Sequence, residues 1–296
     1  MEIQAIGAPY DVVNHHSSNS NQYPKNFKWT TESRQIQVVH DMAIIGMMND
    51  AYTPTNDEIR FGWICESNTV VPQLISLLKE HHEEIFDAGN YEAIFTCDRE
   101  LCELDDRFVF SWAGSNLPWT APEDCKIYDK SKLCSMIASP KGEGSDASSG
   151  HGFRIEWAKK IQNSLDLYGG ALGTERIGFS SNLNDQWHNK ADALNDYMFS
   201  VVIENGNYDG YYTEKITDAF ATGTIPIYHG SPSIGDIFNT DGIIFLDDDF
   251  KIEDLSEELY MSKMDAIKDN FERVKALQGS DDMIAENILS MVEVEV

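Results

Sequence analysis

The clearest chemically active group of side chains lies at the start of a predicted helix. Thr213 can cap that helix, and Glu214 and Lys215 follow it directly. A lysine in a first turn opposes the helix dipole, so Lys215 is best explained by an anion that docks nearby. Glu214 could accept hydrogen bonds from ribose hydroxyls, as acidic residues do in dinucleotide sites. A capped helix with an ordinary surface Glu and Lys is the alternative interpretation.

Three further residues could complete such a site. Asn205 and Tyr211 lie in the loop before this helix and can contribute hydrogen bonds or stacking. Arg154 follows a segment dense in Gly and Ser, residues 139–152. That segment is either an interdomain linker or a loop that contacts a ligand. A helix start with Arg and Lys beside it is suited to a diphosphate.

The elements that must position these residues form one strand–turn–helix–strand unit. Residues 198–203 (MFSVVI) are an apolar strand, and residues 204–210 (ENGNYDG) have the composition of a turn. The helix is predicted to run from Thr213 to about residue 222, and Gly223 supplies its stop. Residues 225–228 (IPIY) form the returning strand, as in a parallel crossover. In open parallel sheets, loops such as 204–212 lie at the ligand-binding edge.

The rest of the chain alternates strands and helices in the same way. Predicted strands are residues 60–65, 93–96, 108–111, 133–138 and 165–168, and predicted helices are residues 71–86, 153–165 and part of 254–277. A length of 296 residues favours two domains. We place the boundary at residue 130, between an N-terminal domain (1–130) and a C-terminal domain (131–296). The final helix could pack back on the N-terminal domain.

The charge balance excludes several classes of partner. With 22 Lys and Arg against 50 Asp and Glu, the net charge is −28, which disfavours nucleic acid and anionic membranes. No long apolar run indicates a membrane helix or signal peptide, so we expect a cytoplasmic protein without membrane insertion. Five cysteines without CxxC spacing predict reduced thiols rather than zinc or disulfides.

Residues 199–232 resemble the signature of the α-1,3/1,4-fucosyltransferase family, glycosyltransferase family 10. The matching parts are Glu-Asn at 204–205, YYTEK at 211–215 and GTIPIYHG at 223–230. Residues 245–250 (FLDDDF), 130–133 and 165–173 are similar to flanking segments of the family. The resemblance implies a GT-B architecture, in which two Rossmann-like domains face across a cleft. It also implies transfer of fucose from GDP-fucose to a glycan acceptor, with inversion and without a bound metal. Residues 1–130 would then be the acceptor-side domain and residues 131–296 the nucleotide-sugar donor-binding domain.

The resemblance also implies roles for particular residues. Arg154 and Lys215 would contact the diphosphate, Glu214 the ribose, and Asn205 and Tyr211 the nucleotide. The general base would be Glu66, which ends a predicted strand, although Cys65 and Ser67 stand where the family has Gly and Asn.

Other residues invite competing interpretations. Asp247, Asp248 and Asp249 suggest a metal, but a single acidic run is typical of a solvated turn. The pairs at 15–16 and 81–82 (His-His) lack carboxylates or cysteines at ligand spacing. The tryptophans at positions 63, 112 and 119 could stack on a sugar or pack in a core.

Two alternative functions remain compatible with the sequence. The same fold could use another nucleotide-sugar donor, since the motif specifies the nucleotide more directly than the sugar. A non-catalytic nucleotide- or carbohydrate-binding relative could keep the donor pocket and lack the base.

Overall fold

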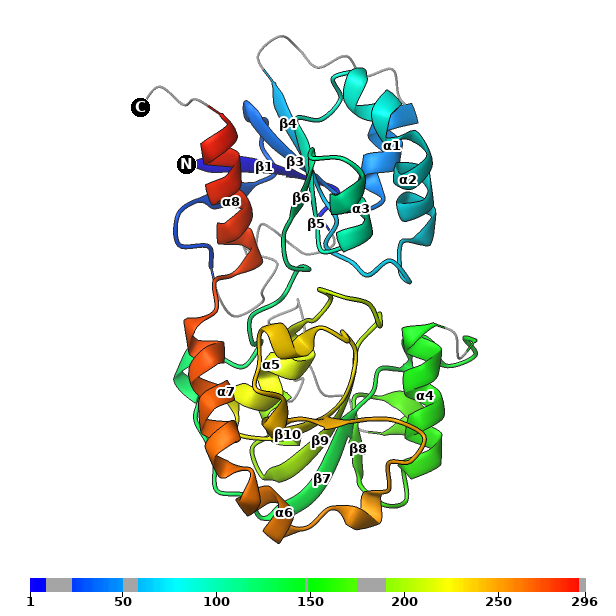
Figure 1. Cartoon of the computed structure of the whole chain (residues 1–296), viewed down its shortest axis with the longest axis vertical. Helices are drawn as coiled ribbons and strands as arrows, with labels where there is room; N and C mark the ends of the chain where they lie inside the picture. Colours follow the sequence, from blue (N-terminus) through cyan, green and yellow to red (C-terminus); the bar gives the residue numbers. More distant parts are fainter. Residues whose placement is uncertain (9–22, 50–57, 147–148, 175–189, 293–296) are drawn as a thin grey trace. The chain divides into compact units, whose positions relative to one another are not determined.

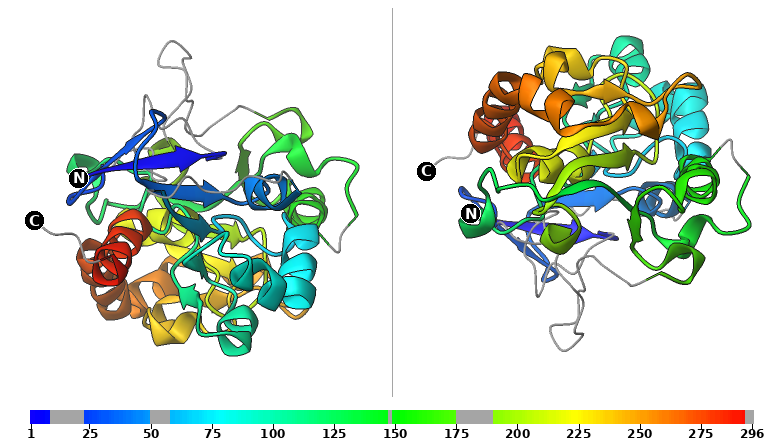
Figure 2. Two further views of the ribbon diagram at one scale, coloured as in Figure 1. Left: turned by 90° about the horizontal axis from the view of Figure 1, so that it is seen from above. Right: turned by 90° about the horizontal axis from the view of Figure 1, so that it is seen from below.

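The computed structural model describes residues 1–8, 23–49, 58–146, 149–174 and 190–292. Within them, the chain divides into two compact α/β units. The N-terminal unit comprises Met1–Asn116, Asp209–Tyr211 and Gln278–Val296, and the C-terminal unit comprises Leu117–Tyr208 and Tyr212–Leu277. The strands of each unit and the helices that flank them can be followed in Figures 1 and 2.

The N-terminal unit is built on a six-stranded parallel sheet in the order β2-β1-β3-β4-β5-β6. Its strands are β1 (Glu2–Ile6), β2 (Lys28–Thr30), β3 (Ile36–His40), β4 (Ile59–Trp63), β5 (Ala93–Thr96) and β6 (Phe108–Phe110). Its helices are α1 (Ala43–Asn49), α2 (Pro72–Asp87), α3 (Arg99–Leu104) and α8 (Ser280–Met291).

Alternate residues of these strands enter two separate cores, because successive side chains point to opposite faces of a sheet. Val39 packs in a cluster with residues of α1, α2 and α3. Its neighbour Val38 packs in a second cluster with Ile284 and Ile288 of α8. The last helix therefore covers one face of the N-terminal sheet (Figure 1).

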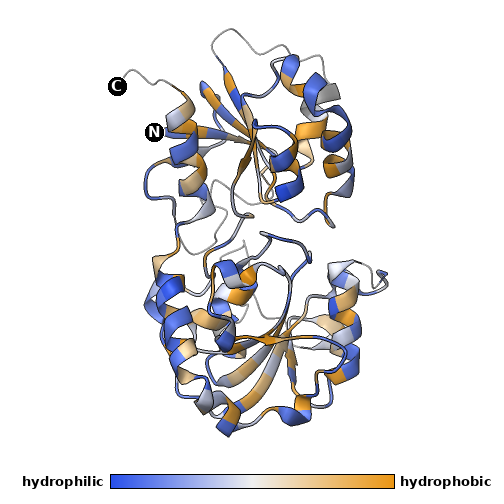
Figure 3. Ribbon diagram, viewed as in Figure 1, coloured by the Kyte–Doolittle hydropathy of each residue, from blue (hydrophilic) through white to orange (hydrophobic). Residues whose placement is uncertain are grey.

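The C-terminal unit contains a five-stranded parallel sheet in the order β11-β10-β9-β7-β8. Its strands are β7 (Lys132–Ile137), β8 (Asp166–Tyr168), β9 (Tyr197–Ile203), β10 (Ile225–His229) and β11 (Ile244–Phe245). Its helices are α4 (Gly150–Ile161), α5 (Glu214–Ala221), α6 (Glu257–Ser262) and α7 (Met264–Ala276). Hydrophobic residues occur along the strands of both sheets, and they alternate with hydrophilic residues along the helices (Figure 3).

Two parallel sheets with helical crossovers confirm the predicted α/β class of GT-B type, with two Rossmann-like domains. The predicted helix cap and stop are also present: the side chain of Thr213 accepts from the Lys215 N–H, and Gly223 has a φ of 73°. In the described part of the chain, every helix is too short or too polar to span a bilayer.

Candidate functional site

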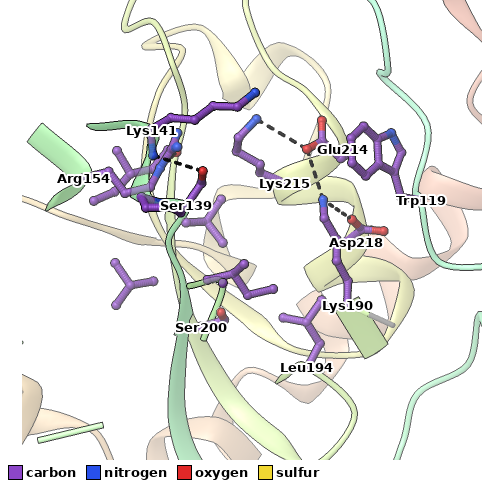
Figure 4. Close-up of a pocket in the computed structure, with 16 residues that line it drawn as sticks. Trp119, Ser139, Lys141, Arg154, Lys190, Leu194, Ser200, Glu214, Lys215 and Asp218 are labelled. Carbon is purple, nitrogen blue, oxygen red and sulfur yellow. Dashed lines mark hydrogen bonds and ion pairs between the residues drawn. The ribbon is translucent and has the colours of Figure 1, made fainter. Parts of the chain in front are cut away.

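In the sheet of the C-terminal unit, the chain connections leave in opposite directions from the neighbouring strands β7 and β9. From β7 the chain proceeds outward through α4 to β8, whereas from β9 it proceeds the other way through α5 to β10. Such a point leaves a crevice at the carboxyl ends of the two strands, between the starts of the following helices. A pocket of about 410 Å³ lies here, lined by the end of β9, by Ser139 after β7, and by residues of α4 and α5 (Figure 4).

Among the described residues, four cationic side chains and two carboxylates line this pocket. The cations are Lys141, Arg154, Lys190 and Lys215, and the carboxylates are Glu214 and Asp218. The local balance is thus positive in a chain whose net charge is −28. A scarce positive charge concentrated at two helix starts is suited to bind an anion.

Arg154 is fixed in the pocket by the end of β9. It lies in the second turn of α4, a helix that Ser149 caps by accepting from the Gly152 N–H. Its Nε and Nη2 donate to the carbonyl oxygen of Ile203 at 3.0 and 2.6 Å, and Nη2 also donates to Asn205 Oδ1 at 2.7 Å. The guanidinium, which is almost fully buried, is therefore held at the crevice by strand β9 and its loop.

Lys215 is held at the start of α5 through Glu204. The buried Glu204 carboxylate accepts from the Thr213 N–H at 3.0 Å and from the Thr213 hydroxyl at 2.7 Å. Lys215 Nζ lies 3.0 Å from Thr213 Oγ1 and 3.5 Å from Glu204 Oε2. Glu204 therefore positions the helix start and its lysine, which gives the Glu-Asn pair of the motif a structural role.

Glu214 is held by two lysines at the same carboxyl oxygen. Its Oε1 lies 3.0 Å from Lys190 Nζ and 3.4 Å from Lys215 Nζ. Burial by itself would raise the pKa of Glu214, but the charges of Lys190 and Lys215 outweigh it and lower the pKa to about 2. Glu214 is therefore an ionised hydrogen-bond acceptor at neutral pH, the state needed to bind hydroxyl groups.

The positive field of the pocket also affects His151, the second residue of α4. Burial lowers its pKa, and the charges of Arg154, Lys215 and Lys141 lower it further, to about 4. His151 is therefore neutral at neutral pH, mainly because it is buried, and the three cations act in the same direction. Ser139 and Lys141 line the pocket. The segment 139–152 lies within the C-terminal unit, which contradicts the interpretation as an interdomain linker.

The structure distributes the predicted site residues between the two units. Arg154, Glu214 and Lys215 line the pocket, and Asn205 contacts Arg154. Tyr211 belongs to the N-terminal unit with Asp209 and Gly210, and it is not among the residues that line the pocket. The predicted nucleotide contact of Tyr211 stays a prediction.

Glu66 also belongs to the N-terminal unit, three residues after β4. Its backbone N–H donates to Asp41 Oδ1 at 3.0 Å, and the Cys65 N–H donates to the same oxygen at 2.8 Å. Asp41 follows β3 and has a positive φ of 43°. The partly buried Glu66 is thus anchored at the carboxyl edge of the sheet, and its role as the base stays a prediction.

The remaining candidate residues differ in their surroundings. Trp63 is completely buried in the N-terminal core, whereas Trp119 lines the pocket. His81 is an exposed residue of α2 beside Glu84, and residues 15–16 lie outside the described part of the chain. The five cysteines are unpaired thiols.

The acidic run after β11 forms a turn, as one of the two interpretations predicts. The carboxylate of Asp247 accepts from the Asp249 N–H at 3.0 Å. Among the described residues, no group of three or more His, Cys, Asp or Glu side chains is arranged to hold a metal ion.

Lys190, Asp218 and Lys141 are pocket residues that sequence reasoning missed, whereas Trp119 was considered as a residue that could stack on a sugar. Asp218 follows Glu214 by four residues, a spacing that places both on one face of a helix and could have been recognised. Lys190 precedes β9 by seven residues and carries no comparable local signal.

Comparison with known proteins agrees with this geometry. Residues 129–274 match the family described as glycosyltransferase family 10 (fucosyltransferase) C-term. The α-(1,3)-fucosyltransferase FucT of Helicobacter pylori is 45% identical over 60 residues, which are 20% of this chain and 13% of that protein. A fucosyltransferase-like protein of Arabidopsis thaliana is 31% identical over 80 residues, 27% of this chain and 14% of that protein.

A solved structure extends the likeness to the whole fold. A crystal structure of an α1,3-fucosyltransferase with GDP aligns with 100% of this chain and 91% of its own, with a TM-score of 0.52 and 16% identity. The two sequence relatives are matched over less than a sixth of their own lengths, and the structural likeness concerns the fold. Residues 129–274, just under half of the chain, are therefore similar to glycosyltransferase family 10.

Proposed function

We propose that this chain is an inverting glycosyltransferase that transfers fucose from GDP-fucose to a hydroxyl group of a glycan acceptor. The observation that carries the proposal is the convergence of Arg154, Lys215 and Lys141 on the pocket at the carboxyl ends of β7 and β9. The family match and the GDP in the solved relative support a nucleoside diphosphate as the occupant.

In the proposed reaction, the pocket stabilises the departing GDP. The bond between the anomeric carbon and the phosphate oxygen lengthens in the transition state, and negative charge develops on the diphosphate. Arg154 and Lys215 are already fixed by Ile203 and Glu204, so little reorganisation is needed to stabilise that charge. Glu214, ionised at neutral pH, would accept hydrogen bonds from the ribose.

Glu66 is the proposed general base, from the N-terminal unit. It would remove the proton of the acceptor hydroxyl as the oxygen attacks the anomeric carbon. Arg154 and Lys215 would neutralise the leaving group, and we expect transfer to continue in the presence of EDTA. Loss of transfer in EDTA that added divalent ions restore would contradict this part of the proposal.

Calorimetry with GDP, UDP and GDP-fucose tests the donor assignment. We expect GDP and GDP-fucose to bind with similar affinity and UDP to bind more weakly. A screen of donor hydrolysis with a panel of nucleotide sugars then identifies the sugar. Preferential turnover of another GDP-sugar would keep the fold and the nucleotide but change the donor, whereas GDP binding without any turnover would indicate a non-catalytic relative.

A further inference from the structure

Lys190 is enclosed by acidic groups more closely than Lys215, whose Nζ lies 3.4 Å from Glu214 Oε1 and 3.5 Å from Glu204 Oε2. Its Nζ lies 3.0 Å from Glu214 Oε1 and 3.0 Å from Asp218 Oδ2. The indole of Trp119 covers it, with 4.3 Å between Nζ and the ring centroid (Figure 4). The lysine side chain is 11% exposed, and those of Glu214 and Asp218 are 8% and 1% exposed. Lys190 is thus paired more closely and buried more deeply than Lys215, and it contributes less net charge toward a diphosphate.

Asp218 is itself fixed from the opposite side. Its Oδ1 accepts from the Thr120 N–H at 2.8 Å and from the Thr120 hydroxyl at 3.0 Å, while Oδ2 contacts Lys190. The carboxylate is therefore held at both oxygens, and it anchors Lys190 against α5. A chain of contacts runs from Thr120 through Asp218 and Lys190 to Glu214, all within the C-terminal unit.

The chain of contacts ends on one oxygen of Glu214. The hydrogen bonds that Lys190 and Lys215 donate to this carboxylate both go to Oε1. A carboxylate held at one oxygen from two sides has a fixed plane, and its second oxygen has a fixed direction. Buried ion networks of this kind are weak evidence for stability, and their best-attested use is to specify a geometry.

We propose that Lys190 is a positioning residue that orients Glu214, so that Glu214 Oε2 accepts a hydrogen bond from a ribose hydroxyl and the pocket selects ribonucleotides. The inference rests on the proposed function, because it assumes that the pocket holds a nucleoside diphosphate. Lys190 would then act in the recognition of the ribose of the nucleotide, whereas Arg154, Lys215 and Lys141 would bind the diphosphate.

The test compares the affinity of GDP with that of 2′,3′-dideoxy-GDP, which lacks both ribose hydroxyls. A hydrogen bond to a charged acceptor corresponds to roughly a tenfold to hundredfold preference for GDP in the unmodified protein. In Lys190→Met, we expect this preference to fall toward unity. A merely structural role would lower both affinities and leave their ratio unchanged.

Two further variants make the comparison decisive. Lys141 lines the pocket as an exposed cation, so Lys141→Met should weaken both nucleotides equally and keep the ratio. If Lys190→Met does not fold because Asp218 is left as a buried unpaired charge, the double variant K190M/D218N removes both charges. The amide oxygen that D218N introduces can still accept the hydrogen bonds from Thr120, and the same loss of preference is expected.

The possible failures can be told apart. If the unmodified protein binds neither GDP nor GDP-fucose, the proposed function fails and this inference fails with it. If it binds GDP and dideoxy-GDP equally, nucleotide binding stands and the ribose contact is wrong. If the folded Lys190 variants keep the full preference for GDP, the positioning role of Lys190 is overturned while the proposed function is untouched.

Discussion

Arg154 and Asn205 are joined by a hydrogen bond of 2.7 Å, from the guanidinium Nη2 to the side-chain Oδ1. The same guanidinium donates to the Ile203 carbonyl, so Arg154 is held by the last residue of β9 and by the loop that follows it. Strand β9 thus determines where the main cation of the pocket lies before any ligand binds.

The first prediction concerns this pair. Arg154→Met should weaken GDP binding by roughly tenfold to hundredfold, because it removes charge-assisted hydrogen bonds to the diphosphate. Asn205→Ala should have a smaller effect, since the Ile203 carbonyl still holds the guanidinium. Isothermal titration calorimetry measures both. Arg273→Met is a matched control, because Arg273 is an exposed residue of α7 paired with Asp269.

The second prediction separates the chemistry from donor binding. Glu66→Gln should lower kcat by at least about a hundredfold, the contribution expected of a general base, while the affinity for GDP stays unchanged. Glu103→Gln, an exposed residue of α3, should leave both quantities as they are. Turnover of Glu66→Gln close to that of the unmodified enzyme would remove Glu66 from the mechanism.

The third prediction concerns the contact between α4 and the loop after β9. A Cβ atom on Gly150 would lie 2.2 Å from the backbone oxygen of Asn205. Gly150→Ala must therefore push the start of α4 away from this loop, and with it Arg154. We expect a loss of about 1–3 kcal/mol in the free energy of unfolding and weaker GDP binding.

Gly46→Ala provides the comparison for this substitution. Gly46 lies in α1, and a Cβ atom there would meet no atom within 4 Å. That variant should be neutral or slightly stabilising, as expected for alanine in a helix. Equal affinity for GDP in Gly150→Ala and the unmodified protein would contradict the close packing of α4 at the pocket.

The fourth prediction is a pH dependence of stability that arises from Asp41. Burial raises the pKa of this carboxyl to about 7, against the opposing hydrogen bond from the Glu66 N–H. Its Oδ2 is a buried atom for which the described residues offer no hydrogen-bond partner. The folded protein therefore keeps a proton there that the unfolded chain loses near pH 4.

The sign of the effect follows from proton binding. Between about pH 4 and pH 7 the folded state binds more protons, so the contribution of Asp41 to stability is present below pH 4 and is lost as the pH rises to 7. Asp41→Asn removes this loss, and asparagine tolerates the positive φ. Urea unfolding should find the variant more stable than the parent at pH 8, by on the order of 3 kcal/mol, with a smaller difference near pH 4. A difference that is the same at both pH values would contradict the raised pKa.

Much of the C-terminal unit could be predicted from sequence because its signals are local. Apolar runs predicted β7, β9 and β10, and Thr213 and Gly223 marked the ends of α5. The helix after the Gly- and Ser-rich segment was predicted at residues 153–165 but begins at Gly150 and ends at Ile161. Its true start depends on the Ser149 cap and on Gly150 packing against Asn205, and a long-range contact of this kind leaves no local signal.

Other parts of the structure could not be predicted for the same reason. Strand β1 (Glu2–Ile6) was not recognised, although Ile3 is completely buried by its neighbours in the sheet. In the site, Arg154 and Lys215 could be proposed because they lie beside family motifs. Lys190 could not, because its role depends on the positions of Glu214 and Asp218, 24 and 28 residues further along the chain.

The position of α8 has a consequence for how the protein is made. Ile284, Ala285 and Ile288 complete one core of the N-terminal sheet. The nascent chain cannot bury that face until α8 has left the ribosome, and every strand of the C-terminal unit has been synthesised by then. The unit that is translated second can therefore mature before the one that is translated first.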